Sequence, residues 1–160
     1  MSKRGTNVVL ILENIRSAQN VGAMFRTADA IGVKKIYLSG YTPAPLDKFE
    51  RPSKEISKTA LGAESTIPWE SVPATNILIE TLKKDGYEIV AVEQTPDAID
   101  YKKFIPSGPT AFILGNEVDG VLPTTLTDAD VVIEIPMRGT KESLNVATTA
   151  GIVLFRTLDV

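Results

Sequence analysis

The sequence contains no cysteine and no histidine. Without cysteine, disulfides, zinc–thiolate sites and cysteine nucleophiles are excluded. Without histidine, the usual general base near neutral pH and the commonest metal ligand are both missing. Any acid–base step must therefore use a carboxylate, a lysine, an arginine, the substrate itself or water, and we expect a site that holds no metal.

Long hydrophobic runs are also missing near the start of the chain. The longest there, Val8–Leu12, has five residues, whereas a membrane-spanning helix needs about 20. The opening residues MSKRGTN show no signal-peptide cleavage pattern. We therefore expect a cytoplasmic protein without a membrane partner. Because 160 residues suffice to bury a core unaided, we expect a single domain over residues 1–160.

The net charge of −3 does not by itself indicate a nucleic-acid partner, but the charge is unevenly distributed. Residues 1–60 hold 10 Lys or Arg against 5 Asp or Glu, a net of +5, whereas residues 61–160 hold 7 against 15, a net of −8. A polyanion could meet the first third of the chain, or surface charge simply varies along the sequence. Charge alone leaves both interpretations open.

Short runs rich in Val and Ile alternate with helical patterns along the whole chain. Several of these runs are apolar without alternation, which is typical of strands buried on both faces of a parallel sheet. The predicted strands are 8–12, 35–38, 88–92, 110–114 and 131–135, with a weaker one at 65–68. The predicted helices are 18–31, 74–85 and 145–158, with a shorter one within 53–61, and the segments 39–54 and 93–109 are predicted loops. This order indicates an α/β domain.

Small polar residues precede two of these helices. Ser17 and Asn20 are both suited to cap the first, and Ser143 and Asn145 the last. Glycines follow two helices, where a left-handed cap is common. They are Gly32 and Gly86.

The first predicted helix carries one arginine in the stretch NVGAMFRTADAIGV, residues 20–33. Gly22 and Arg26 are four residues apart and so share one face. Glycine there permits close approach of another backbone or of a ligand. Arg26 either forms a surface ion pair with Asp29 or serves a ligand, and this stretch alone favours the ion pair.

A second motif, AFILGNEVDGV at residues 111–121, runs from a buried strand directly into polar residues. Ligands of parallel sheets gather just past the carboxyl ends of the strands. Gly115 would let a ligand approach the backbone there, and Glu117 places a carboxylate at the same edge. The alternative is a strand followed by a polar turn at 119–120.

A third motif, IEIPMRGTKESLNVATTAGIVLF at residues 133–155, has the same shape of strand, loop and helix. Arg138 and Lys141 lie in the loop, and a helix N-terminus attracts anions. The sequence has neither G-x-G-x-x-G nor G-x-x-x-x-G-K-[ST], so motif evidence supports no nicotinamide or nucleoside-triphosphate enzyme.

Together the three motifs closely resemble those of the SpoU-type (TrmH-like) RNA ribose 2′-O-methyltransferases of the SPOUT superfamily. They occur in the family's order and span residues 20–146. The family's first motif has the form N-x-G-x-x-x-R-x-A and is matched by Asn20, Gly22, Arg26 and Ala28. The second has the form L-G-x-E-x-x-G and is matched by Leu114, Gly115, Glu117 and Gly120. The third has the form I-P-M-x-G-x-x-x-S-L-N-V and is matched by Ile135, Pro136, Met137, Gly139, Ser143, Leu144, Asn145 and Val146.

The resemblance implies a Rossmann-like, mostly parallel sheet with helices on both faces and a C-terminal trefoil knot. It also implies a homodimer that transfers a methyl group from S-adenosylmethionine to a ribose 2′-hydroxyl of tRNA or rRNA. Many similar enzymes carry a further RNA-binding domain; here we expect residues 1–160 to be a single catalytic domain with no added RNA-binding domain. The implied catalytic residues are Arg26, Asn20, Glu117, Ser143 and Asn145. Those implied to bind the cofactor are Leu114, Gly115, Ile135, Met137, Leu144 and Asn145. We assign RNA contacts to Arg16, Lys48, Arg51, Lys54, Lys58, Arg138 and Lys141.

Two other functions compete with this one. The chain could be a catalytically weak or inactive knotted RNA-binding module, although a pure binder does not need the whole catalytic set. It could also methylate a base nitrogen, but the Asn20 and Arg26 pattern belongs to the ribose-modifying branch of the superfamily.

Overall fold

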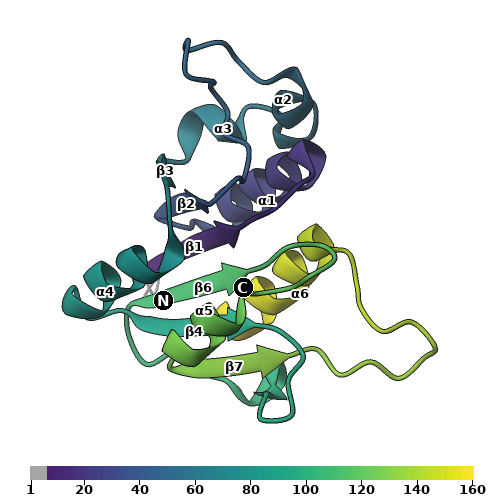
Figure 1. Cartoon of the computed structure of the whole chain (residues 1–160). Coiled ribbons are helices and arrows are strands. Elements are labelled where there is room, and N and C mark those ends of the chain that lie inside the picture. The colour runs from purple at the N-terminus through teal and green to yellow at the C-terminus, as the bar shows by residue number, and fades with distance from the viewer. Residues whose placement is uncertain (1–6) are drawn as a thin grey trace.

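The computed structural model describes residues 7–160, which form one seven-stranded sheet between two layers of helices (Figure 1). Residues 1–6, most of the stretch in which no signal peptide was expected, lie outside the described residues. The elements are β1 (Val8–Glu13), α1 (Ala18–Ile31), β2 (Lys35–Ser39), α2 (Lys54–Ala60), α3 (Ala63–Thr66), β3 (Trp69–Val72), α4 (Thr75–Lys84), β4 (Glu88–Val92), β5 (Ile99–Asp100), a 3₁₀ turn (Tyr101–Lys103), β6 (Thr110–Leu114), α5 (Pro123–Asp128), β7 (Val131–Glu134) and α6 (Val146–Leu158).

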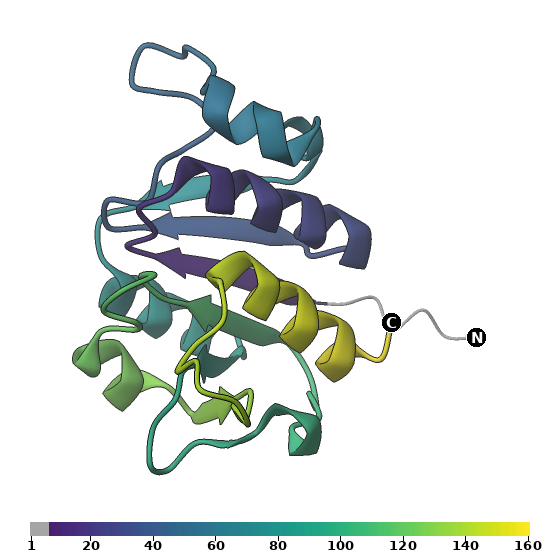
Figure 2. The same ribbon diagram turned by 90° about the vertical axis from the view of Figure 1, so that its right-hand side faces the viewer.

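The strands lie in the order β3-β2-β1-β6-β4-β7-β5, and every neighbouring pair is parallel. Parallel neighbours need crossover connections, which here are mostly helical. Figure 2 shows the strands pointing toward one common edge of the sheet, where the loops that follow them gather. The expected α/β class with a mostly parallel sheet is confirmed, and the trefoil knot stays a prediction from the family resemblance.

The central strand β6 and its neighbour β1 are buried along their whole length. Successive residues of β1 point to opposite faces. Leu10 and Leu12 therefore pack in the cluster formed with α1, α2 and α6, whereas Val9 and Ile11 pack in the cluster formed with α4. This explains why the strand sequences are apolar runs rather than alternating ones.

Helix α1 has the predicted bounds, and the residues at its ends explain them. The Ser17 hydroxyl accepts from the backbone N–H of Asn20 at 3.2 Å and caps the start. Gly32, with φ 83°, closes the end, and its N–H donates to Ala28. Because Ser17 provides the cap, the side chain of Asn20 is available for other contacts.

Gly22 faces α2 and not a ligand site, which corrects one interpretation of the first motif. A Cβ atom on Gly22 would overlap the Thr59 hydroxyl and the Ile56 carbonyl oxygen. The Thr59 hydroxyl in turn donates to the Gln19 carbonyl at 2.8 Å. The glycine therefore allows α1 and α2 to pack closely.

We expect Gly22→Ala to lower the free energy of unfolding by about 1–3 kcal/mol, because the added methyl group meets backbone that cannot move away cheaply. Urea denaturation measures the change. Gly151→Ala is the matched control, since Gly151 is also helical and a Cβ there meets nothing within 4 Å. It is expected to be neutral or to stabilise by up to about 1 kcal/mol. Equal effects of the two substitutions would contradict the packing role.

Three predictions of secondary structure are wrong or incomplete. The weak strand predicted at 65–68 is absent, because α3 occupies 63–66 and the strand begins only at Trp69, which pairs with Ile36. Helix α5 was missed because it is short and rich in Thr, although Pro123 stands at its first position, where proline is common. The loop predicted at 93–109 also contains β5 and the 3₁₀ turn. Within residues 7–160 no helix has the length and apolar character needed to cross a membrane.

Candidate functional site

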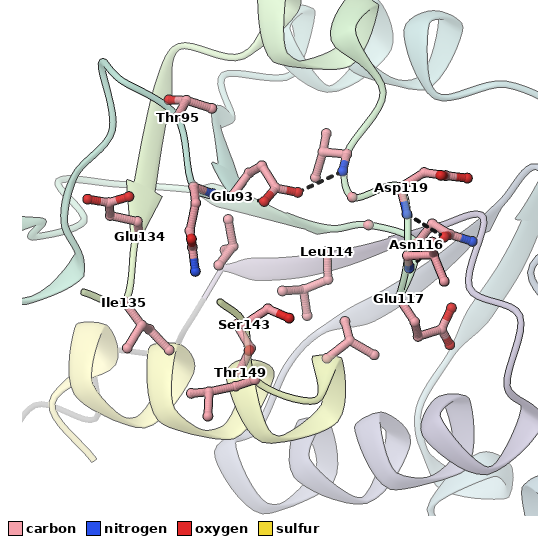
Figure 3. Close-up of a pocket in the computed structure, with 18 of the residues that line it drawn as sticks. Glu93, Thr95, Leu114, Asn116, Glu117, Asp119, Glu134, Ile135, Ser143 and Thr149 are labelled. Carbon is pink, nitrogen blue, oxygen red and sulfur yellow. Dashed lines mark hydrogen bonds between the residues drawn. The ribbon is translucent and has the colours of Figure 1, made fainter. Parts of the chain in front are cut away.

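A cavity of about 500 Å³ opens at the carboxyl edge of the sheet, beyond β4, β6 and β7 (Figure 3). Three loops form its walls: the one after β4, the one after β6, and the long one between β7 and α6. The structure brings together here all six residues predicted to bind the cofactor, together with Glu117 and Ser143. Glu93, Gln94, Thr95, Asn116, Glu134 and Thr149 also line the cavity and were not singled out from the sequence.

The loop after β6 is a tight turn braced from several sides. The Asn116 side-chain oxygen accepts from the backbone N–H groups of Val118 and Asp119, both at 2.8 Å. Its amide nitrogen donates to the Asn14 carbonyl at 2.8 Å and to the Tyr41 hydroxyl at 2.9 Å. This wall of the cavity is therefore held in place before any ligand binds.

Gly115 is required by this turn. A Cβ atom on Gly115 would overlap the backbone of Gly120 and Val121, so only glycine fits where the strand meets the returning loop. Glu93 secures the far end, because its carboxylate accepts from the Val121 N–H at 2.9 Å. The polar-turn interpretation of residues 119–120 is thus correct, and the turn is at the same time a wall of the cavity.

Glu117 connects the second motif to the start of α1. Its carboxylate accepts from the backbone N–H groups of Arg16 and Ser17 at 3.0 and 3.1 Å. It also accepts from the side-chain amide of Asn20 at 3.1 Å. A negative charge at a helix N-terminus is stabilised by the free N–H groups and the helix dipole.

The third motif joins the same chain of hydrogen bonds. Asn145 donates through its side-chain amide to the Asn20 side-chain oxygen at 3.2 Å. The side-chain oxygen of Asn145 caps α6 by accepting from the N–H groups of Ala147 and Thr148 at 2.9 and 3.2 Å. One continuous chain of hydrogen bonds beside the cavity therefore links Asn145, Asn20 and Glu117, which come from three different motifs.

The hydrogen bonds to Glu117 set its protonation state. Partial burial raises the pKa of its carboxyl, but the donors on Arg16, Ser17 and Asn20 outweigh that effect, so the pKa lies below its ordinary value. Glu117 is therefore a charged acceptor that positions Asn20 and the start of α1, and it is unsuited to take up a proton near neutral pH.

We expect Glu117→Ala to lower the free energy of unfolding by about 1 kcal/mol at pH 7, because the start of α1 loses a cap. A carboxyl whose pKa is lowered by folding stabilises the fold above its unfolded pKa, and this contribution is lost as the pH falls through the folded pKa. The difference between wild type and Glu117→Ala should therefore shrink between pH 7 and pH 3 in urea titrations.

Glu80→Ala is the control for this pH dependence, because Glu80 is exposed on α4. It is expected to change stability little at either pH. A Glu117→Ala effect that grows toward acid would contradict the positioning role.

Arg26 takes no part in this chain of hydrogen bonds. Its side chain is exposed, and among the described residues it has no hydrogen bond or ion pair. The ion pair with Asp29 is not formed, since Asp29 accepts instead from the Thr66 hydroxyl at 3.2 Å. Among the described residues, Arg26 has no hydrogen bond to Asn20, Glu117 or Asn145, whose side chains bond one another and the starts of the helices instead. Ser143 lines the cavity with an exposed side chain.

The residues predicted to contact RNA are all exposed and fall into two groups. In the first group, Arg16 lies beside the cavity, because its backbone N–H donates to Glu117, which lines the cavity. Arg138 and Lys141 belong to the same group and lie in the loop between β7 and α6, part of which also lines the cavity. The other group lies on the loop before α2 and on α2 itself; it consists of Lys48, Arg51, Lys54 and Lys58.

A parallel α/β sheet with a preformed cavity at its carboxyl edge, walled by three sequence motifs, is the architecture of an enzyme-like domain. Comparison with known proteins defines the class more closely. The model of the SpoU rRNA Methylase family matches residues 7–155, so the chain belongs to this family.

Curated relatives agree with this assignment. The chain is 36% identical over 150 residues to the 23S rRNA (guanosine-2'-O-)-methyltransferase RlmB of Neisseria meningitidis serogroup B, a match that covers 94% of this chain and 57% of that protein. It is 30% identical over 155 residues to the tRNA (guanosine(18)-2'-O)-methyltransferase of Aquifex aeolicus, covering 97% of this chain and 70% of that protein. The chain thus spans little more than half the length of several curated relatives, including those of Neisseria and Nitrosomonas.

Solved structures give the same result. The TrmH/SpoU tRNA modifying enzyme of A. aeolicus superposes with a TM-score of 0.85 at 27% identity, covering 98% of this chain and 76% of that one. The AdoMet-bound rRNA methyltransferase from Sinorhizobium meliloti superposes with a TM-score of 0.84 at 30% identity, covering 94% of this chain and 55% of that one.

Proposed function

We propose that the chain transfers a methyl group from S-adenosylmethionine to a ribose 2′-hydroxyl of structured RNA. The observation that carries this proposal is the chain of hydrogen bonds from Asn145 through Asn20 to Glu117, which joins the three motifs beside one cavity. The names of the relatives, which include rRNA and tRNA 2'-O-methyltransferases, support the reaction and leave both RNA classes as substrates.

The cavity suits S-adenosylmethionine. Its volume of about 500 Å³ lies in the usual range for small-molecule sites. Apolar side chains for the adenine and the methionine chain adjoin backbone polar groups at Gly115. The residues that would hold the cofactor are Leu114, Gly115, Ile135, Met137, Leu144 and Asn145. When bound, the cofactor supplies a methyl group on a sulfonium, and the work left to the protein is chiefly positioning.

Arg26 would act on the RNA rather than on the cofactor. Arginine side chains keep their proton in proteins, so this residue is a poor base. Its guanidinium would bind a phosphate beside the target ribose and stabilise negative charge developing on the 2′-oxygen. The proton of the 2′-hydroxyl would leave to water or to that phosphate, and the sulfonium would leave as a neutral thioether. Asn20 and Asn145, which are held by hydrogen bonds, would orient the ribose, and Ser143 would contact it from the cavity wall.

The position of Arg26 supports a homodimer. Its exposed side chain does not line the cavity of its own chain, so a second copy could supply this arginine at the mouth of the cavity. The apolar side chains of Leu144 and Phe155, each 39% exposed, would be covered by the same contact. Each of the two sites would then be completed by the partner. An enzyme of this kind would work in the cytoplasm, where its RNA substrates are found.

The proposal is tested by incubating the protein with tritiated S-adenosylmethionine and with total tRNA or rRNA. Calorimetry with S-adenosylmethionine alone measures cofactor binding separately. We expect both cofactor binding and RNA labelling. Binding of RNA without any labelling would instead support an RNA-binding module without turnover, and binding of neither ligand would refute the proposal.

A further inference from the structure

Phe49 lies at an exposed turn in the loop between β2 and α2. Its side chain is 65% exposed, so its burial contributes little to the core. Two cations lie against its ring: the Lys48 ammonium at 5.1 Å and the Arg51 guanidinium carbon at 4.9 Å from the ring centroid. An exposed aromatic ring with two cations against it is a combination that polar turns do not require.

The turn is fixed by Asp47. One oxygen of its carboxylate accepts from the backbone N–H groups of Phe49 and Arg51 at 2.8 and 3.0 Å. The other accepts from Nε of Arg51 at 2.8 Å. An antiparallel bridge between Leu46 and Pro52 closes the base of the loop. The backbone at Phe49 and the guanidinium of Arg51 are therefore held before any ligand arrives, which reduces the entropy lost on binding.

The surroundings favour a polyanion. Lys54 and Lys58 follow on α2, both exposed. Figure 2 shows the loop before α2 projecting from the same edge of the sheet as the loops around the cavity. An RNA strand that runs along this edge from the cavity would meet the turn with its bases and its phosphates.

We propose that residues 47–51, which we call the Phe49 turn, form a stacking platform for an unpaired RNA base outside the nucleotide that is methylated. The inference rests on the proposed function for the presence of RNA. Base stacking on an aromatic ring tolerates any sequence and needs an unstacked base, while neighbouring cations bind the phosphates. Arg51 stays fixed by Asp47. Lys48, which has no ion pair within residues 7–160, turns to a phosphate when a base takes its place on the ring.

The test uses the full chain and two RNA probes: a hairpin with 2-aminopurine in its unpaired loop, and a fully paired duplex of the same length. We expect Phe49→Leu to weaken hairpin binding by roughly 5- to 100-fold, the usual range for one stacked base, and duplex binding by less than about twofold, because paired bases cannot splay onto the ring. The quenching of 2-aminopurine fluorescence by the wild type should be lost in Phe49→Leu and kept in Phe49→Tyr.

Salt titration separates stacking from charge. Phe49→Leu should leave the slope of log affinity against log salt unchanged, whereas Lys48→Gln should reduce it by about one phosphate contact. Ile77→Ala is the matched control, because Ile77 is 61% exposed on α4 without flanking cations, and it should change nothing.

Any of three results for Phe49→Leu would overturn the inference. These are equal losses of hairpin and duplex binding, unchanged hairpin binding, or a changed self-association of the protein with its RNA affinity intact. Cofactor binding and methyl transfer are read independently, so failure of the proposed function is seen as their absence in the wild type. Failure of this inference alone is seen as a wild-type enzyme whose RNA affinity does not depend on Phe49.

Discussion

Replacing Arg26 by alanine is expected to lower methyl transfer by roughly 10³-fold, the upper range for losing one group that stabilises developing charge. Affinity for S-adenosylmethionine should not change, because Arg26 lies outside the cavity. Single-turnover labelling of RNA measures the first quantity and calorimetry the second. Arg26→Lys should recover only part of the rate, since an ammonium cannot grip phosphate with the paired donors of a guanidinium.

Lys84→Ala, which removes an exposed cation from α4, is the control and should leave transfer unchanged. Near-normal transfer by Arg26→Ala would show that the arginine is not part of the site.

A mixing experiment then tests whether Arg26 acts across a dimer. At a cofactor concentration near the Kd of the wild type, a chain with Arg26→Ala and a chain with Gly115→Ala are each nearly inactive alone under this account. A mixed dimer has one cavity that is intact and faces an intact arginine. Statistical mixing should restore about a quarter of wild-type activity. No recovery, despite exchange of subunits shown by native mass spectrometry, would place Arg26 and its cavity on the same chain.

Gly115→Ala is expected to have the second large effect. The added methyl group overlaps the backbone of Gly120 and Val121, so the loop after β6 must move away from the cavity. A displacement of about 1 Å at a binding site can cost on the order of 10²-fold, and we expect a loss of that size or more in affinity for S-adenosylmethionine. Crowding in this buried place should also lower the free energy of unfolding by about 1–3 kcal/mol.

Gly108→Ala is the matched control, because Gly108 precedes the same strand and a Cβ there meets nothing within 4 Å. Its cofactor affinity should equal that of the wild type. Full cofactor affinity in Gly115→Ala would mean that the cofactor does not depend on the position of this loop.

The sequence predicts well those features that local patterns determine. The bounds of α1 follow from its apolar spacing, from Ser17 and from Gly32. The strands β4 and β6 follow from apolar runs that are buried on both faces, and their order with the helices defines the class of fold. The residues predicted to bind the cofactor meet at one cavity because parallel strands end at the same edge.

Features that depend on long-range contacts were not predictable. Asn20 and Glu117 are 97 residues apart and Asn20 and Asn145 are 125 apart, and no spacing rule connects them. The space beside Gly22 is filled by α2, so the same glycine that suggests a ligand in the sequence serves helix packing in the fold. The Phe49 turn was not predictable for a similar reason, because the hydrogen bonds of Asp47 fix its conformation and composition does not reveal them.

The most direct test of the central claim is the chemical position of the transferred methyl group. RNA labelled by the protein with tritiated S-adenosylmethionine is hydrolysed in alkali, which cleaves only after riboses with a free 2′-hydroxyl. We expect the label in alkali-stable dinucleotides and, after full nuclease digestion, in 2′-O-methylated nucleosides. Label that appears in mononucleotides would show methylation of a base and would contradict this account of the site.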